Sequence, residues 1–111
     1  MTDRELLEMA SKAAGIDKDY PLVFGDRGAH YWNPLIDDGD ALRLAVKLGL
    51  KDYFGIEIQS TCTQCTAFEP WEHIQYEDHN NDPYEYHNND PYAATRRAIV
   101  RAAAEIGRGM E

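Results

Sequence analysis

Two cysteines have a spacing that is known from metal and redox sites. Cys62 and Cys65 are separated by two residues, as in zinc knuckles and thiol-redox motifs. A zinc site needs two further ligands, for which His73 and His79 are available, but their spacing matches no standard zinc finger. The neighbouring threonines do not favour the helix that a thioredoxin-type motif opens. Zinc and redox chemistry stay open as alternatives, and the interpretation we prefer is two ordinary thiols with no bound metal.

Three aspartates precede an apolar helical pattern. Asp37, Asp38 and Asp40, with His30 nearby, could bind a divalent cation for metal-assisted hydrolysis. A calcium-binding loop has a longer series of ligands, however, and aspartates before a helix commonly cap it. With Asp37 at the N-cap and Asp40 three residues later, both charges lie where the helix dipole favours them. We therefore expect capping, and we predict neither catalytic residues nor a cofactor.

A six-residue sequence, HNNDPY, occurs at residues 79–84 and again at 87–92. Its histidines and Asn/Asp side chains could bind a transition metal, but nothing in a polar loop fixes the geometry of the ligands. We interpret the repeat as a local duplication that lengthens a polar loop at about 77–90. In the second copy, Asp90 is expected to cap the last helix and Pro91 to occupy its first position.

Aromatic and arginine side chains form another candidate site. Tyr31 and Trp32 can stack on a planar base, and Arg96, Arg97 or Arg101 can hold phosphate through forked N–H donors. The alternative is structural, with the tryptophan in the core and the arginines on a solvated face. These five residues are the predicted binding site for a nucleotide-type small molecule.

Three segments have apolar residues at the spacing of a helix. The first follows a capping box at Thr2 and Glu5. The second is apolar over nearly its whole circumference, so it must be covered by the sheet and by another helix or subunit. The expected helices are residues 3–14, the segment from Asp37 to 49, and 91–106, with Gly15, Gly49 and Gly107 as their ends.

Alternating patterns predict a small, mostly antiparallel sheet. Residues 20–24 are expected to form an edge strand, because proline cannot donate to a central ladder, and to return as residues 29–32. Residues 54–60 place their isoleucines on one face, and residues 73–77 alternate in the same way, so these two can pair. Residues 61–71 are either their connection or part of a third strand.

The composition indicates one folded domain. The chain has 111 residues, of which 43% are hydrophobic and 28% charged. No apolar run approaches the roughly 18 residues that span a bilayer, and the N-terminus is charged where a signal peptide is apolar. The cytoplasm is therefore the expected compartment. The net charge of −9 disfavours direct nucleic-acid binding, although it fits a partner with a basic groove.

Two blocks carry a resemblance to a known family. YWNPLIDDGDALRLAVKLGL at residues 31–50 and DPYAATRRAIVRAAAEIG at residues 90–107 resemble the phage α/β/α sandwich domain family. Its members are small proteins of phages and prophages whose activity is generally unassigned. The resemblance implies a three-layer α/β/α sandwich, with helices on both faces of a sheet, and supplies no catalytic residues.

Several functions remain open. We expect a non-catalytic phage accessory protein that acts in counter-defence in the infected host cell, as a homo-oligomer that sequesters a nucleotide-type signalling molecule. The alternative is an acidic inhibitor that covers a basic nucleic-acid-binding groove of a host or CRISPR effector. A metal-dependent nucleotide hydrolase is a further alternative, but no nucleotide-hydrolase, serine-hydrolase or zinc-protease motif occurs in the chain.

Overall fold

The computed structural model describes residues 2–25, 28–51, 53–68 and 84–110. Three helices and two antiparallel sheets make up this part of the chain, which confirms the predicted mixed α/β class of the α+β type. The helices are α1 (Asp3–Ala14), α2 (Asp38–Lys51) and α3 (Pro91–Gly109). One sheet is a hairpin of β1 (Leu22–Gly25) and β2 (Gly28–Tyr31), and the other has the order β3 (Tyr53–Ile58), β4 (Cys62–Phe68), β5 (Tyr84–Tyr86).

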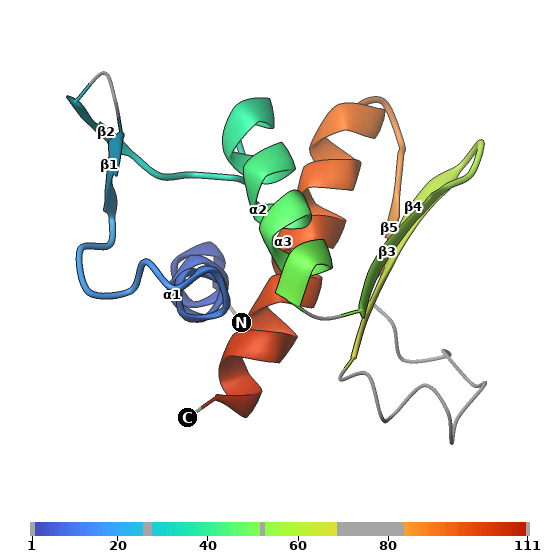
Figure 1. Cartoon of the computed structure of the whole chain (residues 1–111). Helices are drawn as coiled ribbons and strands as arrows, with labels where there is room; N and C mark the ends of the chain where they lie inside the picture. Colours follow the sequence, from blue (N-terminus) through green and yellow to red (C-terminus); the bar gives the residue numbers. More distant parts are fainter. Residues whose placement is uncertain (1, 26–27, 52, 69–83, 111) are drawn as a thin grey trace.

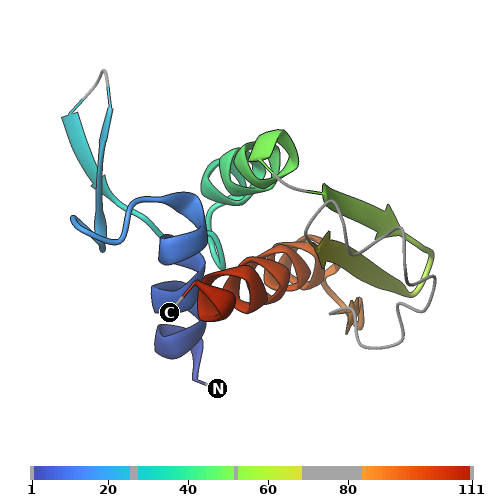
Figure 2. The same cartoon turned by 60° about the horizontal axis from the view of Figure 1, so that its bottom comes forward.

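Helix α3 is the central element of the fold (Figure 1). It packs against α1 on one side and against β4 and β5 on the other, and α2 lies beside it. The β1–β2 hairpin projects away from the three helices (Figure 2). The layers of the described residues therefore follow the order sheet, α2 with α3, and α1. This is not the helix, sheet, helix order that the resemblance implied, because α1 packs on α3 and not on the sheet.

The predicted caps are confirmed at the start of all three helices. Thr2 and Glu5 form the reciprocal capping box of α1. The carboxylate of Asp37 accepts from the backbone N–H of Asp40 at 2.8 Å, at the start of α2. Asp90 caps α3, with Pro91 in the first turn. These short-range signals begin helices because the first backbone N–H groups of a helix have no partner within it.

The predicted helix ends are correct only for α1. Gly15 adopts the left-handed conformation, with φ of 75°, that ends a helix. The prediction that Gly49 and Gly107 do the same is wrong, since α2 continues to Lys51 and α3 to Gly109. A glycine ends a helix only where the backbone turns to positive φ, and neither of these two does so.

Gly107 has a different use, at the crossing of α1 and α3. A Cβ atom built on Gly107 would lie 1.8 Å from the backbone oxygen of Met9, so the two backbones touch. Small side chains on both helices are fully or almost fully buried: Ala10, Ala13 and Ala14 of α1, and Ala98, Ala102 and Ala103 of α3. Alanine and glycine therefore set the short distance between these helices.

Helix α2 is covered on one side in the described structure. Ala41, Leu44 and Leu48 are buried in the core, whereas Leu42 is 65% exposed and Val46 is also exposed. The expected cover over a second side is therefore absent among the described residues of this chain. None of the three helices combines the length and the apolar character needed to cross a membrane.

Most of the strand predictions are confirmed. Residues 22–25 and 28–31 form the expected hairpin, and β3 matches the predicted strand at residues 54–60. Its partner is β4, so residues 61–71 contain the third strand that was one of two alternatives. The predicted strand at 73–77 lies outside the described residues. The loop expected at 77–90 contains β5 in its described part.

The crossing of α1 and α3 predicts a sharp effect for one added methyl group. Gly107→Ala should lower the free energy of unfolding by about 3 kcal/mol, because the backbones would have to separate. Gly49→Ala is the matched control: a Cβ there meets no atom within 4 Å, so stability should rise by up to about 1 kcal/mol. Urea unfolding monitored by circular dichroism measures both. Equal effects of the two substitutions would contradict the close crossing.

Candidate functional site

The five predicted ligand-binding residues do not converge in the structure. Trp32 is only 6% exposed and belongs to the core, with its ring edge-to-face against Tyr20 at 6.1 Å between centroids. Tyr31, the next residue back, is exposed on the β1–β2 hairpin. The arginines lie on α3, which packs mainly against α1, α2, β4 and β5. A planar ligand therefore cannot stack on this tryptophan while the core is intact.

Each of the three predicted arginines has a carboxylate partner. Arg96 donates to Asp38 at 2.6 Å and also to the backbone oxygen of Leu35 at 2.8 Å. Arg97 donates to Asp3 at 2.9 Å. Arg101 donates to Glu85, which also faces Arg97. These pairs join α3 to α1, to the start of α2 and to β5. The three arginine charges are therefore already paired with carboxylates within the protein.

Asp40 is the most buried carboxylate of the described chain, with 1% of its surface exposed. Its Oδ2 accepts from the backbone N–H of Asn33 at 3.0 Å. Its Oδ1 accepts from Arg43 at 2.9 Å and lies 3.1 Å from Nε2 of His30. The carboxylate thereby ties β2 and the segment before α2 to the helix. From the sequence, Asp40 was expected to be an acidic residue in the first turn of the helix, with a cation ligand as the alternative, and these hydrogen bonds were not predicted.

Hydrogen bonding decides the charge of Asp40. Burial raises the pKa of the Asp40 carboxyl group, but the hydrogen bonds from Asn33, Arg43 and His30 together outweigh it, so the pKa is lowered from 3.8. Both oxygens already accept from the protein. The described residues contain no group of three or more His, Cys, Asp or Glu side chains placed to hold a metal ion. Asp40 is therefore a structural acceptor.

The two cysteines lie on one strand and on opposite faces of it. Both belong to β4, and residues three apart in an extended strand point in opposite directions. Cys65 is fully buried on the α3 side, whereas Cys62 is partly exposed. The pair therefore cannot bind one ion together, which removes the spacing argument for a zinc knuckle.

The second HNNDPY copy has a structural role. Its histidine, His87, lies 2.9 Å through Nε2 from Oγ1 of the fully buried Thr63, and that hydroxyl lies 2.8 Å from Oγ1 of Thr95. The backbone N–H of His87 donates to Thr61. A short polar network thus links β4, the segment after β5 and α3. The first copy, apart from its last residue, lies outside the described residues.

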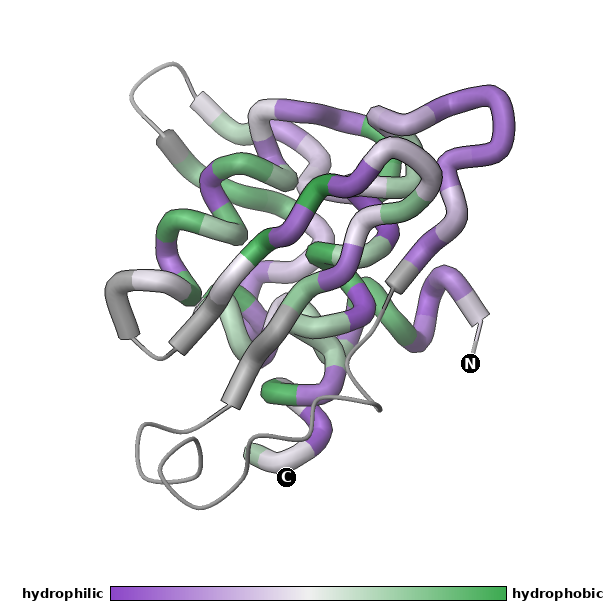
Figure 3. Tube along the Cα trace, turned by 90° about the vertical axis from the view of Figure 1, so that its right-hand side faces the viewer, coloured by the Kyte–Doolittle hydropathy of each residue, from purple (hydrophilic) through white to green (hydrophobic). Residues whose placement is uncertain are grey.

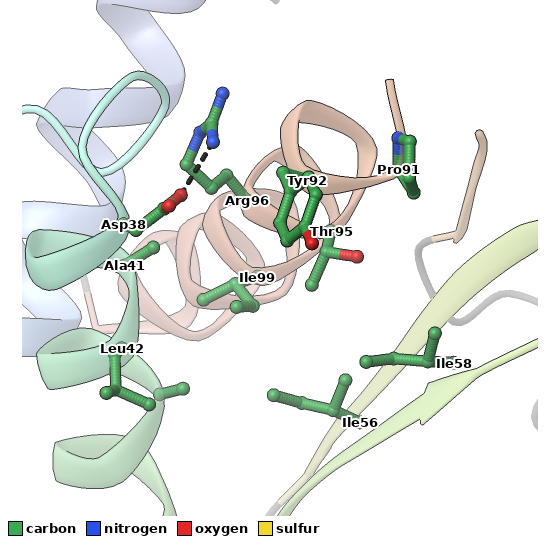
Figure 4. A pocket seen from close by; sticks show the side chains of 11 residues that line it. Asp38, Ala41, Leu42, Ile56, Ile58, Pro91, Tyr92, Thr95, Arg96 and Ile99 are labelled. Carbon is green, nitrogen blue, oxygen red and sulfur yellow. Dashed lines mark hydrogen bonds and ion pairs between the residues drawn. The ribbon is translucent and has the colours of Figure 1, made fainter. Parts of the chain in front are cut away.

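An apolar groove of about 470 Å³ lies between α2, β3 and α3 (Figure 4). Helix α3 forms its floor, and α2 and β3 form its two walls. Its volume falls within the range of roughly 300–1,000 Å³ that is usual for ligand sites. The apolar lining comes from side chains on all three elements, among them Ala41, Leu42, Ile56, Ile58, Tyr92 and Ile99.

The groove is open because large apolar side chains on its walls are not covered. Leu42 lies on α2, Ile58 on β3 is 66% exposed, and Tyr92 at the start of α3 is 72% exposed. Among the described residues, the charged ones that line it are Asp38 and Arg96, which are paired with each other at its rim. Of the five predicted site residues, Arg96 alone lines this groove. The other residues that line the groove were not predicted as a site. The sequence features that could have indicated them are the apolar circumference of α2 and the alternating pattern of β3.

The Asp40 network predicts a pH-dependent loss of stability. A lowered pKa means that ionised Asp40 stabilises the fold above pH 3.8 and that this contribution is lost as the pH falls through the folded value. Asp40→Asn should therefore cost about 2 kcal/mol near pH 7, and the difference from the wild type should shrink below pH 3.8. Asp37→Asn keeps a capping acceptor and serves as the control. A cost that is the same at both pH values would contradict this assignment.

Comparisons with known proteins give no match. No protein family matches the chain, and neither a curated protein nor a solved structure is significantly similar to it. The resemblance to phage α/β/α sandwich proteins therefore stays a prediction. The geometry of the groove is the basis on which a function can be argued.

Proposed function

We propose that this protein is a non-catalytic binding protein whose ligand occupies the apolar groove between α2, β3 and α3. The observation that supports the proposal is the groove itself, about 470 Å³ in volume and walled by exposed apolar side chains. Exposed apolar surface of this kind lowers stability and solubility unless a ligand or partner covers it. The free energy released by covering it is the source of the affinity.

The chemistry of the lining suits binding and not reaction. Among the described lining residues, Asp38 and Arg96 form an ion pair with each other. Thr95 and Tyr92 contribute one hydroxyl group each. Oγ1 of Thr95 is already 2.8 Å from Oγ1 of Thr63. In the part of the chain that the structure describes, no histidine, cysteine or second carboxylate lines the groove to act as a base or nucleophile. Within the described residues the groove therefore offers contact area and no paired catalytic groups.

A nucleotide-type ligand is the second candidate for the same groove. Tyr92 and Arg96 are four residues apart on α3 and both line it, so a base could contact the ring while the guanidinium reaches a phosphate. The Asp38 carboxylate and the net charge of −9 oppose such an anion. The phage counter-defence role, the cytoplasm of the infected cell and the acidic-inhibitor alternative stay predictions from the sequence.

Binding of a neutral apolar dye tests the proposed site directly. Nile red should bind the wild-type protein with increased fluorescence, and Ile58→Glu should weaken that binding by about 10-fold because it places a charge in the groove. Ile36→Glu is the matched control, since Ile36 is 74% exposed and does not line the groove.

Circular dichroism would check that both variants are folded. Equal loss of dye binding in the two variants, or no loss in Ile58→Glu, would overturn the groove as the binding site. The same titration with a nucleoside triphosphate in place of the dye examines the second candidate. Competition between the nucleotide and the dye would favour it.

A further inference from the structure

The apolar face of the three-stranded sheet continues beyond the area that α3 covers. Thr63 and Cys65 of β4 are fully buried on the α3 side. Their partners across the ladder are Ile58 and Ile56 of β3, which share the same face but remain exposed. The alternation of apolar and polar residues along β3 is visible in Figure 3. Among the described elements, α3 covers β4 on this face and leaves these two isoleucines of β3 exposed.

The opposite wall of the groove, formed by α2, also has exposed apolar side chains. Leu42 of α2 faces the groove, and Val46 lies one turn further along the same helix and is also exposed. Figure 4 shows Leu42 on one side and Ile56 and Ile58 on the other, with α3 between them. The open space thus lies in the helix layer, beside α3 and over β3. An additional helix there would cover the exposed side chains of both walls.

The shape of the space favours a helix over a compact small molecule. The exposed apolar side chains lie one turn apart on α2 and two residues apart on β3, so they form two rows and not a single enclosed hollow. An amphipathic helix presents a matching row of side chains at positions i, i+3, i+4 and i+7. Such a helix would pack on α3 and the sheet as a further member of the helix layer.

The negative net charge of the chain favours a basic partner protein over a second copy of this chain as the occupant of the groove. The net charge is −9, so two copies repel each other while a basic segment is attracted. At the rim of the groove, the Asp38 carboxylate is 74% exposed, although it accepts from Arg96. Asp37 precedes it and Asp90 caps α3, and both are exposed. A basic side chain can reach Asp38 from solvent without breaking the contact that Arg96 makes.

We infer that the groove between α2, β3 and α3 binds an amphipathic helix of a partner protein, with its apolar row against Leu42, Ile56 and Ile58 and basic residues on its polar face. This inference rests on the proposed function, since it names the class of ligand for the same groove. The partner is identified by its chemistry, a cationic amphipathic helix. The apolar row supplies the affinity, and the basic face selects this partner over an acidic one.

A set of synthetic peptides tests the inference. A peptide of about 18 residues with leucine at helical spacing and lysine elsewhere should bind and become helical, as measured by calorimetry and circular dichroism. A peptide with glutamate in place of lysine should not bind, nor should a scrambled peptide of the same composition. Raising the salt from about 0.1 M to about 0.5 M should weaken binding without abolishing it, because only the charge component is screened.

Variants on both walls locate the peptide. Ile58→Glu and Leu42→Glu should each weaken binding by about 10-fold, whereas Ile36→Glu should not. Asp38→Asn should weaken it by about 3-fold. Equal binding of the scrambled peptide, or binding that neither wall variant weakens, would overturn the inference.

Two further outcomes separate this inference from the proposed function. Dye binding that Ile58→Glu weakens, without binding of the cationic peptide, would leave the groove as a binding site and reject the helix. Loss of neither signal in Ile58→Glu would reject both. A dimer in native mass spectrometry that Ile58→Glu dissociates would show that a second copy occupies the groove, which also rejects the partner helix.

Discussion

The contact between Gly107 and Met9 is the constraint on which the rest of the structure depends. At this crossing the backbones of α1 and α3 touch, and both helices bury several alanines. With its other sides α3 packs against α2 and the sheet. Helix α3 can therefore contact every other layer of the described fold. A bulkier residue at this crossing would move the central element and all the surfaces that it organises.

Two polar anchors then fix the elements that surround α3. Asp40 holds the segment around Asn33 and the β2 strand against α2, through a carboxylate that stays ionised although it is buried. Arg96 holds the start of α2 against α3, through the backbone of Leu35 and the carboxylate of Asp38. Helix α2 is thus secured at its N-terminal end. Its exposed apolar side and β3 stay apart, and the groove lies between them.

The features that could be predicted from the sequence are those that neighbouring residues decide. The capping residues Thr2, Asp37 and Asp90 satisfy N–H groups within three residues of themselves, so local spacing identifies them. The alternation of Ile56 and Ile58 places both on one face by the geometry of a strand alone. The placement of the candidate site residues could not be predicted in this way, since Trp32 lies in the core and Tyr20 packs against its ring. No pattern along the chain shows which residue twelve positions away will cover a tryptophan.

By itself the sequence determined the helix starts, the hairpin, the strand at β3 and an unusually apolar second helix, since each follows from contacts between residues close in the chain. Only the tertiary structure decided which of its polar and small residues are buried and what they contact. Gly107 lies at the crossing of two helices and does not end a helix. The arginines pair with acidic residues, and the buried Asp40 carboxylate accepts hydrogen bonds. The tertiary structure also decided that Leu42 and Ile58 remain uncovered on facing walls. Burial and pairing depend on segments far apart in the chain, and a groove exists only where such segments meet without filling the space between them.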